Sequence, residues 1–341
     1  MTRANAYLSA GIDLDAGNRA VQLMTSAVRS TYGPEVLYGI GAFGGLYDGA
    51  RLKAMHEPVL VSSTDGVGTK TMVACTLRSY RTLGMDIVNH CVNDILVQGA
   101  DPLFFMDYIA MPNIDPQLVA AVVTGAAEAC RAAGCALLGG ETAEMPGVYA
   151  PGELDLVGTI VGCVERGEII DGTGIATGDL LLGLPSSGLH TNGFSLVRRI
   201  FPPETFAMYA EVLGCTLGEA LVEPHCSYLA PVRAIRQAVL IKGMAHITGG
   251  GFVDNIPRVL PKGLVAVINR QAWQVPALFR LIECEGQVAN DEMYRVFNMG
   301  IGLVIAVAPQ DAAAAIRASA DQAIIIGRVT TQESTERVLL Q

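Results

Sequence analysis

The sequence has few charged and few aromatic side chains. Charged residues make up 16% and aromatic residues 6% of the 341 positions, with a single tryptophan. Hydrophobic residues account for 51%, so the composition excludes a disordered chain. There is no run of basic residues and the formal net charge is −10, so a basic stripe that binds nucleic acid is not expected.

Long apolar runs are also missing. A membrane-spanning helix needs roughly 18 or more consecutive apolar residues, and the most apolar window, 118–133, is interrupted by Thr124, Glu128 and Arg131. Residues 1–17 lack the basic region and apolar core of a secretory signal. The eight cysteines include no C-x-x-C pair, which is typical of free thiols in a reducing compartment. We therefore expect a cytoplasmic protein with no membrane partner.

Glycine, in contrast, is abundant. The chain has 38 glycines in 341 residues, about 11%, against an average near 7%. They fall in short clusters without a collagen period, which favours tight turns whose backbone can approach a phosphate closely. An acidic protein binds phosphate through backbone N–H groups and through metal held by carboxylates. The negative net charge therefore does not exclude a phosphorylated ligand.

Strands and helices alternate between residues 55 and 165, whereas the sequence before residue 55 has no clear periodicity. Patterns of apolar residues predict strands at 58–63, 103–110, 135–138 and 156–164, and helices at 83–98 and 116–133. The helix at 116–133 has the clearest ends, because Asp115 is a favourable N-cap, Pro116 suits the first turn and Gly134 suits the end.

A domain boundary is expected in the Gly-rich, charged segment 165–178, which separates domain 1–168 from domain 169–341. In the second domain, the same patterns predict strands at 179–184, 265–269 and 304–307, helices at 231–238 and 311–321, and a surface insertion at 201–220. The fold class is therefore mixed α/β (α+β).

Two Gly-rich segments in the first domain suggest phosphate contacts. Gly39, Gly41 and Gly44 formally match G-x-G-x-x-G, but a dinucleotide site needs a strand before and a helix after the motif. A plain turn and a phosphate-covering loop both remain open here. Residues 65–71 (DGVGTKT) imitate the end of a P-loop without its first glycine. This combination of an acid, two glycines and a lysine suits magnesium–phosphate chemistry, although an exposed turn is the alternative.

Acidic residues follow several of the predicted strands and helices. Asp94 lies on a polar stripe of the predicted helix 83–98 with apolar neighbours on most sides, and a buried acid needs a partner such as a metal. Glu141 and Glu144 follow a Gly-Gly pair, where they could instead begin a helix. Together with Asp65 and Asp107, these acids predict a magnesium site at the carboxyl edge of the sheet.

The second domain contains three further Gly-rich segments. His190 lies in 186–193 (SSGLHTNG), a polar loop before a predicted helix, where it could act as acid, base or phosphate donor, or simply stabilise the turn. Thr248 begins a second loop, 248–251 (TGGG), and residues 298–302 (NMGIG) form a third. The first two loops could bind a phosphate through their backbone, and the third allows a close approach of the backbone.

Several strings, taken together, resemble phosphoribosylformylglycinamidine cyclo-ligases, the family also called aminoimidazole ribonucleotide synthetases. They are TDGVGTK (64–70), VNDILVQGADPLFF (92–105), GGETAEMPG (139–147), SSGLHTNGFSLVR (186–198), HITGGGFVDNIPRVLP (246–261) and MYRVFNMGIG (293–302). The resemblance runs from about Tyr7 to the last strand, in order and with consistent spacing.

The resemblance implies an enzyme of de novo purine synthesis that uses ATP and Mg²⁺. It implies ring closure of formylglycinamidine ribonucleotide to 5-aminoimidazole ribonucleotide through a phosphorylated amide (iminophosphate) intermediate, with ADP and phosphate as the other products. The implied architecture is a homodimer in which the N-terminal sheets pair into a β-barrel, with an ATP- and Mg-binding domain followed by a substrate-binding domain whose mixed sheet is flanked by helices.

The resemblance also assigns roles to single residues. The implied magnesium ligands are Asp65, Asp94 and Glu141, and the implied catalytic residues are His190, Lys70 and Asp94. The implied ATP site comprises Gly41, Phe43, Gly44, Gly45, Asp65, Gly66, Gly68, Thr69, Lys70, Asp107, Glu141 and Thr142. The implied substrate contacts are His190, Thr191, Asn192, Thr248, Gly249 and Gly250. The base that deprotonates the attacking nitrogen is implied to be His190 or a nearby carboxylate.

The sequence departs from the family pattern at two places. His225 and Cys226 stand where family members often have Thr-Arg, and Ala42 replaces a glycine of the loop. These departures concern details of the substrate domain rather than the proposed metal ligands. Two rival interpretations remain. The first is a small-molecule kinase or synthetase of the same ATP-dependent superfamily, which includes thiamine-monophosphate kinases, selenophosphate synthetases and hydrogenase-maturation proteins. The second is an inactive paralogue that serves as a binding subunit. The second-domain strings argue against the first, and the intact acids, Lys70 and His190 argue against the second.

Overall fold

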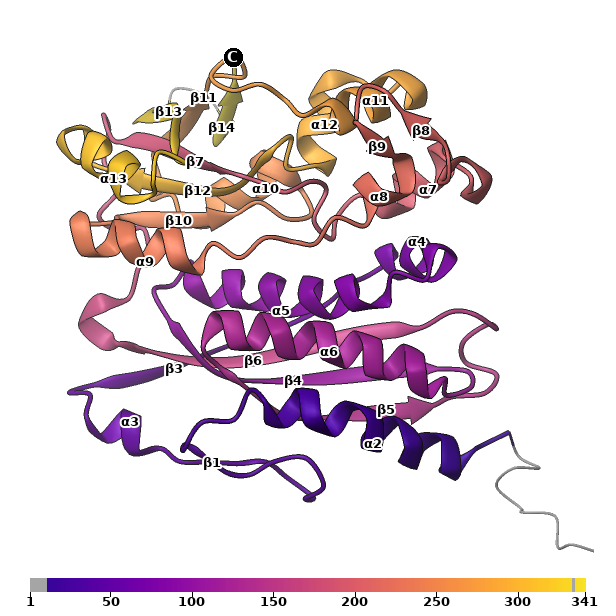
Figure 1. Ribbon diagram of the computed structural model, residues 1–341. Helices are drawn as coiled ribbons and strands as arrows, with labels where there is room; N and C mark the ends of the chain where they lie inside the picture. Colours follow the sequence, from indigo (N-terminus) through magenta and orange to yellow (C-terminus); the bar gives the residue numbers. More distant parts are fainter. Residues whose placement is uncertain (1–10, 333–334) are drawn as a thin grey trace, which may run out of the picture. The chain divides into compact units, whose positions relative to one another are not determined.

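The computed structural model describes residues 11–332 and 335–341 and divides the chain into two compact units (Figure 1). The N-terminal unit comprises Met1–Ile95 and Asp101–Arg166, and the C-terminal unit comprises Leu96–Ala100 and Gly167–Gln341. The start of the family resemblance, at residues 7–10, lies outside the described residues. The mixed α+β class predicted from the sequence is confirmed.

The N-terminal unit is built on a four-stranded sheet. In spatial order its strands are β3 (Pro58–Gly66), β6 (Asp155–Glu165), β4 (Asp101–Met111) and β5 (Ala136–Glu144). Strand β6 is antiparallel to both β3 and β4, whereas β4 and β5 are parallel. All four predicted strands of this unit are present, but β5 continues through Glu144, well beyond the predicted end at Leu138.

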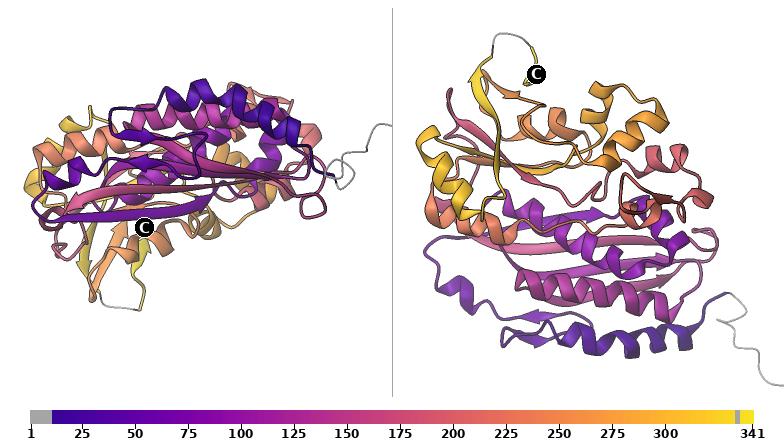
Figure 2. Two further views of the ribbon diagram at one scale, coloured as in Figure 1. Left: turned by 90° about the horizontal axis from the view of Figure 1, so that it is seen from below. Right: turned by 45° about the horizontal axis from the view of Figure 1, so that its top comes forward.

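Three long helices cover one face of this sheet: α2 (Leu14–Arg29), α5 (Tyr80–Leu96) and α6 (Pro116–Ala133) (Figures 1 and 2). Helix α6 begins and ends as predicted, because the Asp115 carboxylate accepts the backbone N–H groups of Gln117 and Leu118, and Gly134 adopts a φ of 72°. A Cβ on Gly125 of α6 would overlap the backbone carbonyl of Arg81 in α5. The absence of a side chain there lets the two helices pack backbone against backbone.

The segment before residue 55 contains more structure than its sequence pattern indicates. Helix α2 was not predicted, although Asp13 caps it by accepting the N–H groups of Asp15 and Ala16. The shorter elements of this unit are β1 (Val36–Tyr38), β2 (Leu46–Tyr47), α3 (Ala50–Lys53) and α4 (Lys70–Leu77). The 39–45 segment connects β1 to β2 rather than a strand to a helix, so the dinucleotide interpretation of its glycines is wrong.

The C-terminal unit contains a six-stranded mixed sheet. Its spatial order is β10 (Gly243–His246), β12 (Ile301–Val307), β7 (Leu180–Pro185), β13 (Ile324–Thr331), β11 (Leu264–Ile268) and β14 (Val338–Leu340). Strands β11 and β14 pair in parallel, and the other described pairs are antiparallel. Strands β10, β13 and β14 were not predicted; β10 has only four residues, all buried.

Helices of the C-terminal unit are shorter than those of the N-terminal unit. They are α7 (Phe194–Ile200), α8 (Leu217–Leu221), α9 (Leu229–Ala238), α10 (Gly251–Asn255), α11 (Ala277–Gly286), α12 (Asn290–Val296) and α13 (Ala312–Ala318). The segment predicted as a surface insertion forms the small hairpin β8 (Tyr209–Ala210) and β9 (Cys215–Thr216), followed by α8.

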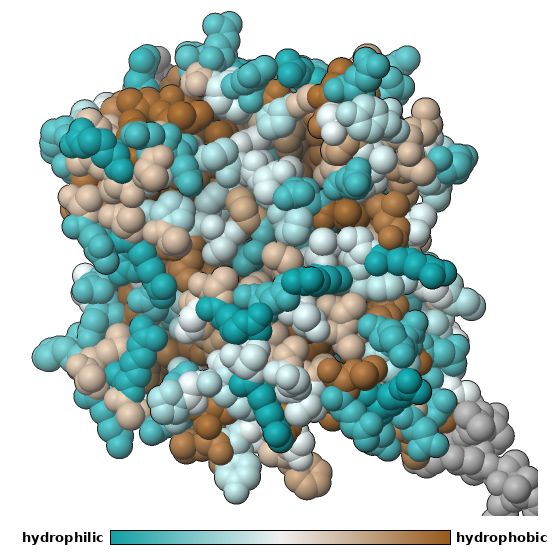
Figure 3. Space-filling model, viewed as in Figure 1, coloured by the Kyte–Doolittle hydropathy of each residue, from teal (hydrophilic) through white to brown (hydrophobic). Residues whose placement is uncertain are grey.

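Among residues 11–332 and 335–341, no helix is both long and apolar enough to cross a bilayer. On the face drawn in Figure 3, apolar side chains occur in separate patches divided by hydrophilic ones.

Candidate active site

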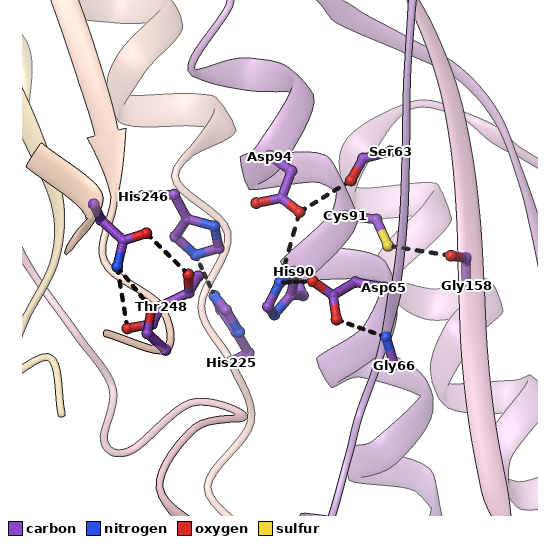
Figure 4. A network of polar contacts seen from close by, with 12 residues as sticks. Ser63, Asp65, Gly66, His90, Cys91, Asp94, Gly158, His225, His246 and Thr248 are labelled. Carbon is purple, nitrogen blue, oxygen red and sulfur yellow. Dashed lines mark hydrogen bonds and ion pairs between the residues drawn. The ribbon is translucent and has the colours of Figure 1, made fainter. Parts of the chain in front are cut away.

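A histidine between two carboxylates forms the first candidate site, in the N-terminal unit. Asp65 lies near the end of β3, and His90 and Asp94 are one turn apart on α5, so one ring faces both acids (Figure 4). The His90 Nε2 atom is 2.9 Å from Asp65 Oδ2 and 3.6 Å from Asp94 Oδ2. The Ser63 hydroxyl donates to Asp94 Oδ2 at 3.0 Å. The predicted acids Asp65 and Asp94 are thus brought together.

The charges of this cluster stabilise one another. Burial alone would lower the pKa of His90, but its hydrogen bond to Asp65 and the charge of Asp94 raise that pKa above its ordinary value. Burial alone would raise the pKa of Asp65, but the hydrogen bond from His90 and the N–H of Gly66 lower it below its ordinary value. The charged forms of His90 and Asp65 thus favour each other.

Lys70 lies at the start of α4, close in sequence to Asp65, but it is committed to an internal partner. Its Nζ atom is 2.8 Å from each carboxylate oxygen of Asp86, and both side chains are buried. The sequence interpretation has Lys70 neutralise the charge of a phosphate. In this structure its charge is balanced by Asp86, because helix α5 brings that carboxylate to it.

A cavity of about 570 Å³ forms the second candidate site of the N-terminal unit. Helix α2, the 39–45 segment, β4 and β5 enclose it, and its walls are largely apolar. Seven of the predicted ATP-binding residues line it, namely Gly41, Phe43, Gly44, Gly45, Asp107, Glu141 and Thr142. Asp65, Gly66, Gly68, Thr69 and Lys70 are not among its lining residues in the described part of the chain. The predicted ATP-binding residues therefore form two groups.

Asp107 connects the two groups through the sheet. Gly158 of β6 pairs with Asp65 on one side and with Asp107 on the other, so the two acids occupy one row, about 10 Å apart at a strand spacing near 4.8 Å. Burial raises the pKa of Asp107 to about 7. This carboxyl group is therefore close to half protonated at neutral pH.

Glu141 lies on the other face of the sheet. In β5 it pairs with Tyr108, whereas its neighbour Gly140 pairs with Asp107, and successive residues of a strand point to opposite faces. The sequence interpretation groups Glu141 with Asp65 and Asp94 as metal ligands; within one chain, the alternation of β5 separates it from them. Glu144, the other acid of this motif, accepts the backbone N–H groups of Asp13 and Ile114 and is therefore structural.

The third candidate site is at one edge of the C-terminal sheet. His190 lies in the loop after β7, Thr248–Gly251 follows β10, and Asn298 precedes β12. Strand β12 lies between β7 and β10 and is antiparallel to both, so these three segments meet at the same edge. The loops approach closely, because a Cβ on Gly249 would be 3.3 Å from Asn192 Oδ1. The predicted substrate-binding loops are thus brought together.

Two buried asparagines, which the sequence interpretation did not assign, fix these loops. Asn298 donates to the Gly188 carbonyl at 2.9 Å and accepts from the Ser186 hydroxyl at 2.9 Å. Asn255 donates to the carbonyls of Thr248, Gly249 and Gly251. His190 itself has a φ of 60°, a conformation that is uncommon for a residue other than glycine and that clusters at functional sites.

Histidines 225 and 246 lie beside His190. The rings of His190 and His225 stack with centroids 3.8 Å apart. The Nε2 atom of His225 is 3.1 Å from that of His246 (Figure 4). Cys226 places its Sγ 3.5 Å from His190 Nε2. The sequence singled out His225 and Cys226 because they differ from the residues that the family often has there. It did not indicate that both would contact His190, the predicted catalytic histidine.

Family comparisons agree with both halves of the chain. Residues 47–164 match the family described as AIR synthase related protein, N-terminal domain, and residues 176–339 match its C-terminal domain. The phosphoribosylformylglycinamidine cyclo-ligase of Desulfitobacterium hafniense (strain DSM 10664 / DCB-2) is 52% identical over 330 residues, covering 96% of this chain and 97% of the relative. The enzyme of the same name from Anaeromyxobacter sp. (strain Fw109-5) is 51% identical over 340 residues, with 98% of each chain covered.

Solved structures share the fold at low sequence identity. Hydrogenase maturation protein HypE in complex with ATP aligns with a TM-score of 0.68 and 17% identity, covering 94% of this chain and 90% of that chain. Thiamine-monophosphate kinase from Stenotrophomonas maltophilia K279a aligns with a TM-score of 0.67 and 18% identity, covering 94% and 96%. The family resemblance noted in the sequence is confirmed by the relatives that are about half identical over nearly their full length. This chain belongs to the phosphoribosylformylglycinamidine cyclo-ligase family.

Proposed function

We propose that the chain catalyses the ATP-dependent closure of formylglycinamidine ribonucleotide to 5-aminoimidazole ribonucleotide, in the cytoplasm. The formamide oxygen of the substrate attacks the γ-phosphorus of ATP, and ADP leaves. The amidine nitrogen then attacks the formyl carbon, the C–O bond to phosphate breaks, and loss of a proton completes the imidazole ring. The formyl oxygen ends in the released phosphate. The relatives named for this activity, at about 50% identity over nearly the whole chain, carry the proposal.

The cavity of the N-terminal unit supports ATP binding. We assign its apolar walls to the adenine and ribose, and the 39–45 segment to a cover over the nucleotide, since Phe43 is exposed there and Gly41 adopts a φ of 96°. Asp107, Glu141 and Thr142 supply polar groups to this wall. In the second group, Gly68 and Thr69 precede helix α4 and are assigned to bind the phosphates through backbone N–H groups, whereas the Gly66 N–H donates to Asp65.

Asp65 and Asp94 fit a magnesium ion. Two carboxylates converge on one side chain, and the Ser63 hydroxyl adds a third oxygen; such hard oxygen donors suit Mg²⁺. When bound, the ion neutralises charge on the ATP phosphates. We retain these two acids as ligands and place Glu141, which lies on the opposite face of β5, at the nucleotide cavity instead.

The loops of the C-terminal unit support binding of the phosphorylated substrate. Asn255 donates to the carbonyls of Thr248, Gly249 and Gly251, which fixes the turn that contains Gly250 and suits its N–H groups to the 5-phosphate. His190, Thr191 and Asn192 face the formyl end in this proposal. The Ser187 N–H donates to His190 Nε2 at 3.3 Å and orients the ring, and we assign to this histidine the removal of a proton from the attacking amidine.

A homodimer formed through the N-terminal sheet is part of the same proposal. The face of the sheet opposite the helices carries Leu60, which is 60% exposed, and Met106, which is 37% exposed. Val157 and Val161 of β6 alternate onto the same face. Apolar side chains on an uncovered sheet face favour pairing with a second copy of this chain.

The activity is tested by incubating the purified chain with ATP, Mg²⁺ and formylglycinamidine ribonucleotide and measuring aminoimidazole ribonucleotide and ADP. We expect equal amounts of both products. Asp94→Asn should lower the rate by about 100-fold or more, whereas the exposed Glu204→Gln should leave it unchanged. A folded, ATP-binding protein that forms no imidazole product would exclude the proposed reaction, and full activity in Asp94→Asn would exclude the metal assignment.

A further inference from the structure

Three histidines from separate segments of the C-terminal unit converge. His190 follows β7, His225 lies between α8 and α9, and His246 ends β10. All three are buried, with exposed fractions of 1%, 0% and 6%. One ring nitrogen from each lies within 4.8 Å of the other two. Imidazole nitrogens gathered at this spacing are the ligands that zinc, nickel, cobalt and copper prefer.

The distances within the group are close to those around a tetrahedral metal ion. At a metal–nitrogen distance of 2.0–2.1 Å, two tetrahedral nitrogen ligands lie about 3.3 Å apart. The Nε2 atoms of His225 and His246 are 3.1 Å apart, so only a small separation of the two rings would admit an ion. The ring of His190 stacks on that of His225 at an interplanar angle of 17°, and it would turn out of this stack to direct a nitrogen at the same point.

Cys226 lies beside one of the three histidines. Its Sγ atom is 3.5 Å from His190 Nε2, and a sulfur and a nitrogen ligand of one tetrahedral zinc ion lie about 3.6 Å apart. A donor set of nitrogen and sulfur favours softer transition metals over Mg²⁺. This separates the group in chemistry from the carboxylates Asp65 and Asp94, whose oxygens suit a hard ion.

We propose that His190, His225 and His246 form a binding site for a divalent transition metal of the zinc type, with Cys226 as the adjacent sulfur donor. His225 and Cys226 stand where the sequence resemblance leads us to expect Thr and Arg, so the site belongs to this chain's own sequence. A consequence rests on the proposed function: an ion held by His190 withholds that histidine from proton transfer. Zinc therefore inhibits ring closure, and chelation restores it.

The binding test uses Co²⁺, whose visible spectrum reports ligand geometry, with the full-length chain stripped of metal by chelation. We expect one equivalent to bind with the intense bands of a tetrahedral ion, and excess Mg²⁺ not to displace it. A charge-transfer band in the near ultraviolet, lost in Cys226→Ser, identifies the sulfur donor. Wild-type protein that takes up no Co²⁺ or Zn²⁺ in the micromolar range overturns the proposal and leaves the histidines as a hydrogen-bonded core.

Variants locate the ion. His225→Thr should weaken Co²⁺ binding by about 10- to 100-fold or more while the far-ultraviolet circular dichroism is unchanged. The exposed His56→Asn is the matched control and should bind like the wild type. Equal affinity in His225→Thr overturns the proposal, because the ion is then held elsewhere. Binding is measured without ATP or substrate, so its outcome is independent of whether the chain closes the imidazole ring.

Discussion

Both carboxylate oxygens of Asp86 lie 2.8 Å from the Nζ atom of Lys70, and the two side chains are completely buried. This pair joins the first residue of α4 to α5 inside the N-terminal unit. A buried charge that loses its partner is strongly destabilising, whereas replacing both charges by apolar groups is often tolerated. This pair therefore predicts that the loss of Lys70 lowers the stability of the protein, whether or not Lys70 also acts on phosphate.

Replacing Lys70 alone should destabilise the protein. We expect Lys70→Met to lower the free energy of unfolding by about 3–5 kcal/mol, because Asp86 is left buried without its cation. Urea unfolding monitored by circular dichroism measures this loss. The exposed Lys53→Met should change stability by less than about 0.5 kcal/mol. If the double variant Lys70→Met, Asp86→Leu is no more stable than Lys70→Met, the uncompensated charge is not the cause.

Asp107 should make the stability of the protein depend on pH. Burial raises its pKa to about 7 from the ordinary value of 3.8, so between these values the folded state holds a proton that the unfolded state has lost. The contribution of Asp107 to the free energy of unfolding is therefore greatest near pH 4 and declines as the pH rises to about 7. Asp107→Asn should therefore unfold at a higher temperature than the wild type at pH 8, with a smaller difference at pH 5.

Thermal unfolding at several pH values checks this, and about 1 kcal/mol corresponds to a shift of roughly 2–4 °C in a chain of this size or somewhat smaller. The exposed Asp48→Asn is the control and should show no pH-dependent difference from the wild type. A constant difference between Asp107→Asn and wild type from pH 5 to pH 8 would contradict the raised pKa.

A charge on the uncovered face of the N-terminal sheet should dissociate the proposed homodimer. We expect Leu60→Glu to convert a dimer into a monomer, since a carboxylate cannot be buried in an apolar interface without a partner. Light scattering after size-exclusion chromatography measures the mass. Leu240 is 72% exposed and belongs to the C-terminal unit, so Leu240→Glu is the matched control and should remain dimeric. A wild-type monomer at micromolar concentration would exclude this interface.

Gly302 should be essential for the position of His190. A Cβ at this residue would be 2.6 Å from His190 Cε1 and would overlap the hydroxyl of Tyr228. We expect Gly302→Ala to lower the rate of ring closure by about 100-fold, because small displacements of catalytic groups have effects of this size. Gly174→Ala is the control, since a Cβ there meets no atom within 4 Å. Wild-type kinetics in Gly302→Ala would show that the exact place of His190 is unimportant.

Local sequence signals were sufficient where one segment carries its own determinants. Helix α6 was predicted at its observed ends because Asp115 and Gly134 act within a few residues of the backbone that they satisfy. Helix α2 was missed although its sequence is amphipathic; only Ala20 and Val28 are buried in it, and its packing against other elements provides much of the stability. The length of β5 was underestimated because Gly139 and Gly140 suggested a turn, whereas Gly140 leaves room for the Asp107 side chain.

The candidate site was only partly predictable, because some of its contacts depend on the tertiary fold rather than on local sequence. Motifs identified the loops that carry Asp65, Asp94 and His190, and the structure places the two acids around one histidine. Which face of β5 carries Glu141 depends on register, and the partner of Lys70 depends on how α5 packs. The contact between His225 and His246 joins residues 21 positions apart through the tertiary fold, and no local pattern reports it.

The short segment Leu96–Ala100 belongs to the C-terminal unit although the chain on both sides of it belongs to the N-terminal one. Its backbone forms hydrogen bonds with the C-terminal unit. The Gln98 carbonyl accepts the N–H of Ile170, and the Gly99 carbonyl accepts a hydrogen bond from the Arg236 guanidinium at 2.8 Å. During synthesis this segment leaves the ribosome well before its partners Ile170 and Arg236. A fragment that begins at Gly167 lacks this segment, and with it the carbonyl groups that pair with Ile170 and Arg236.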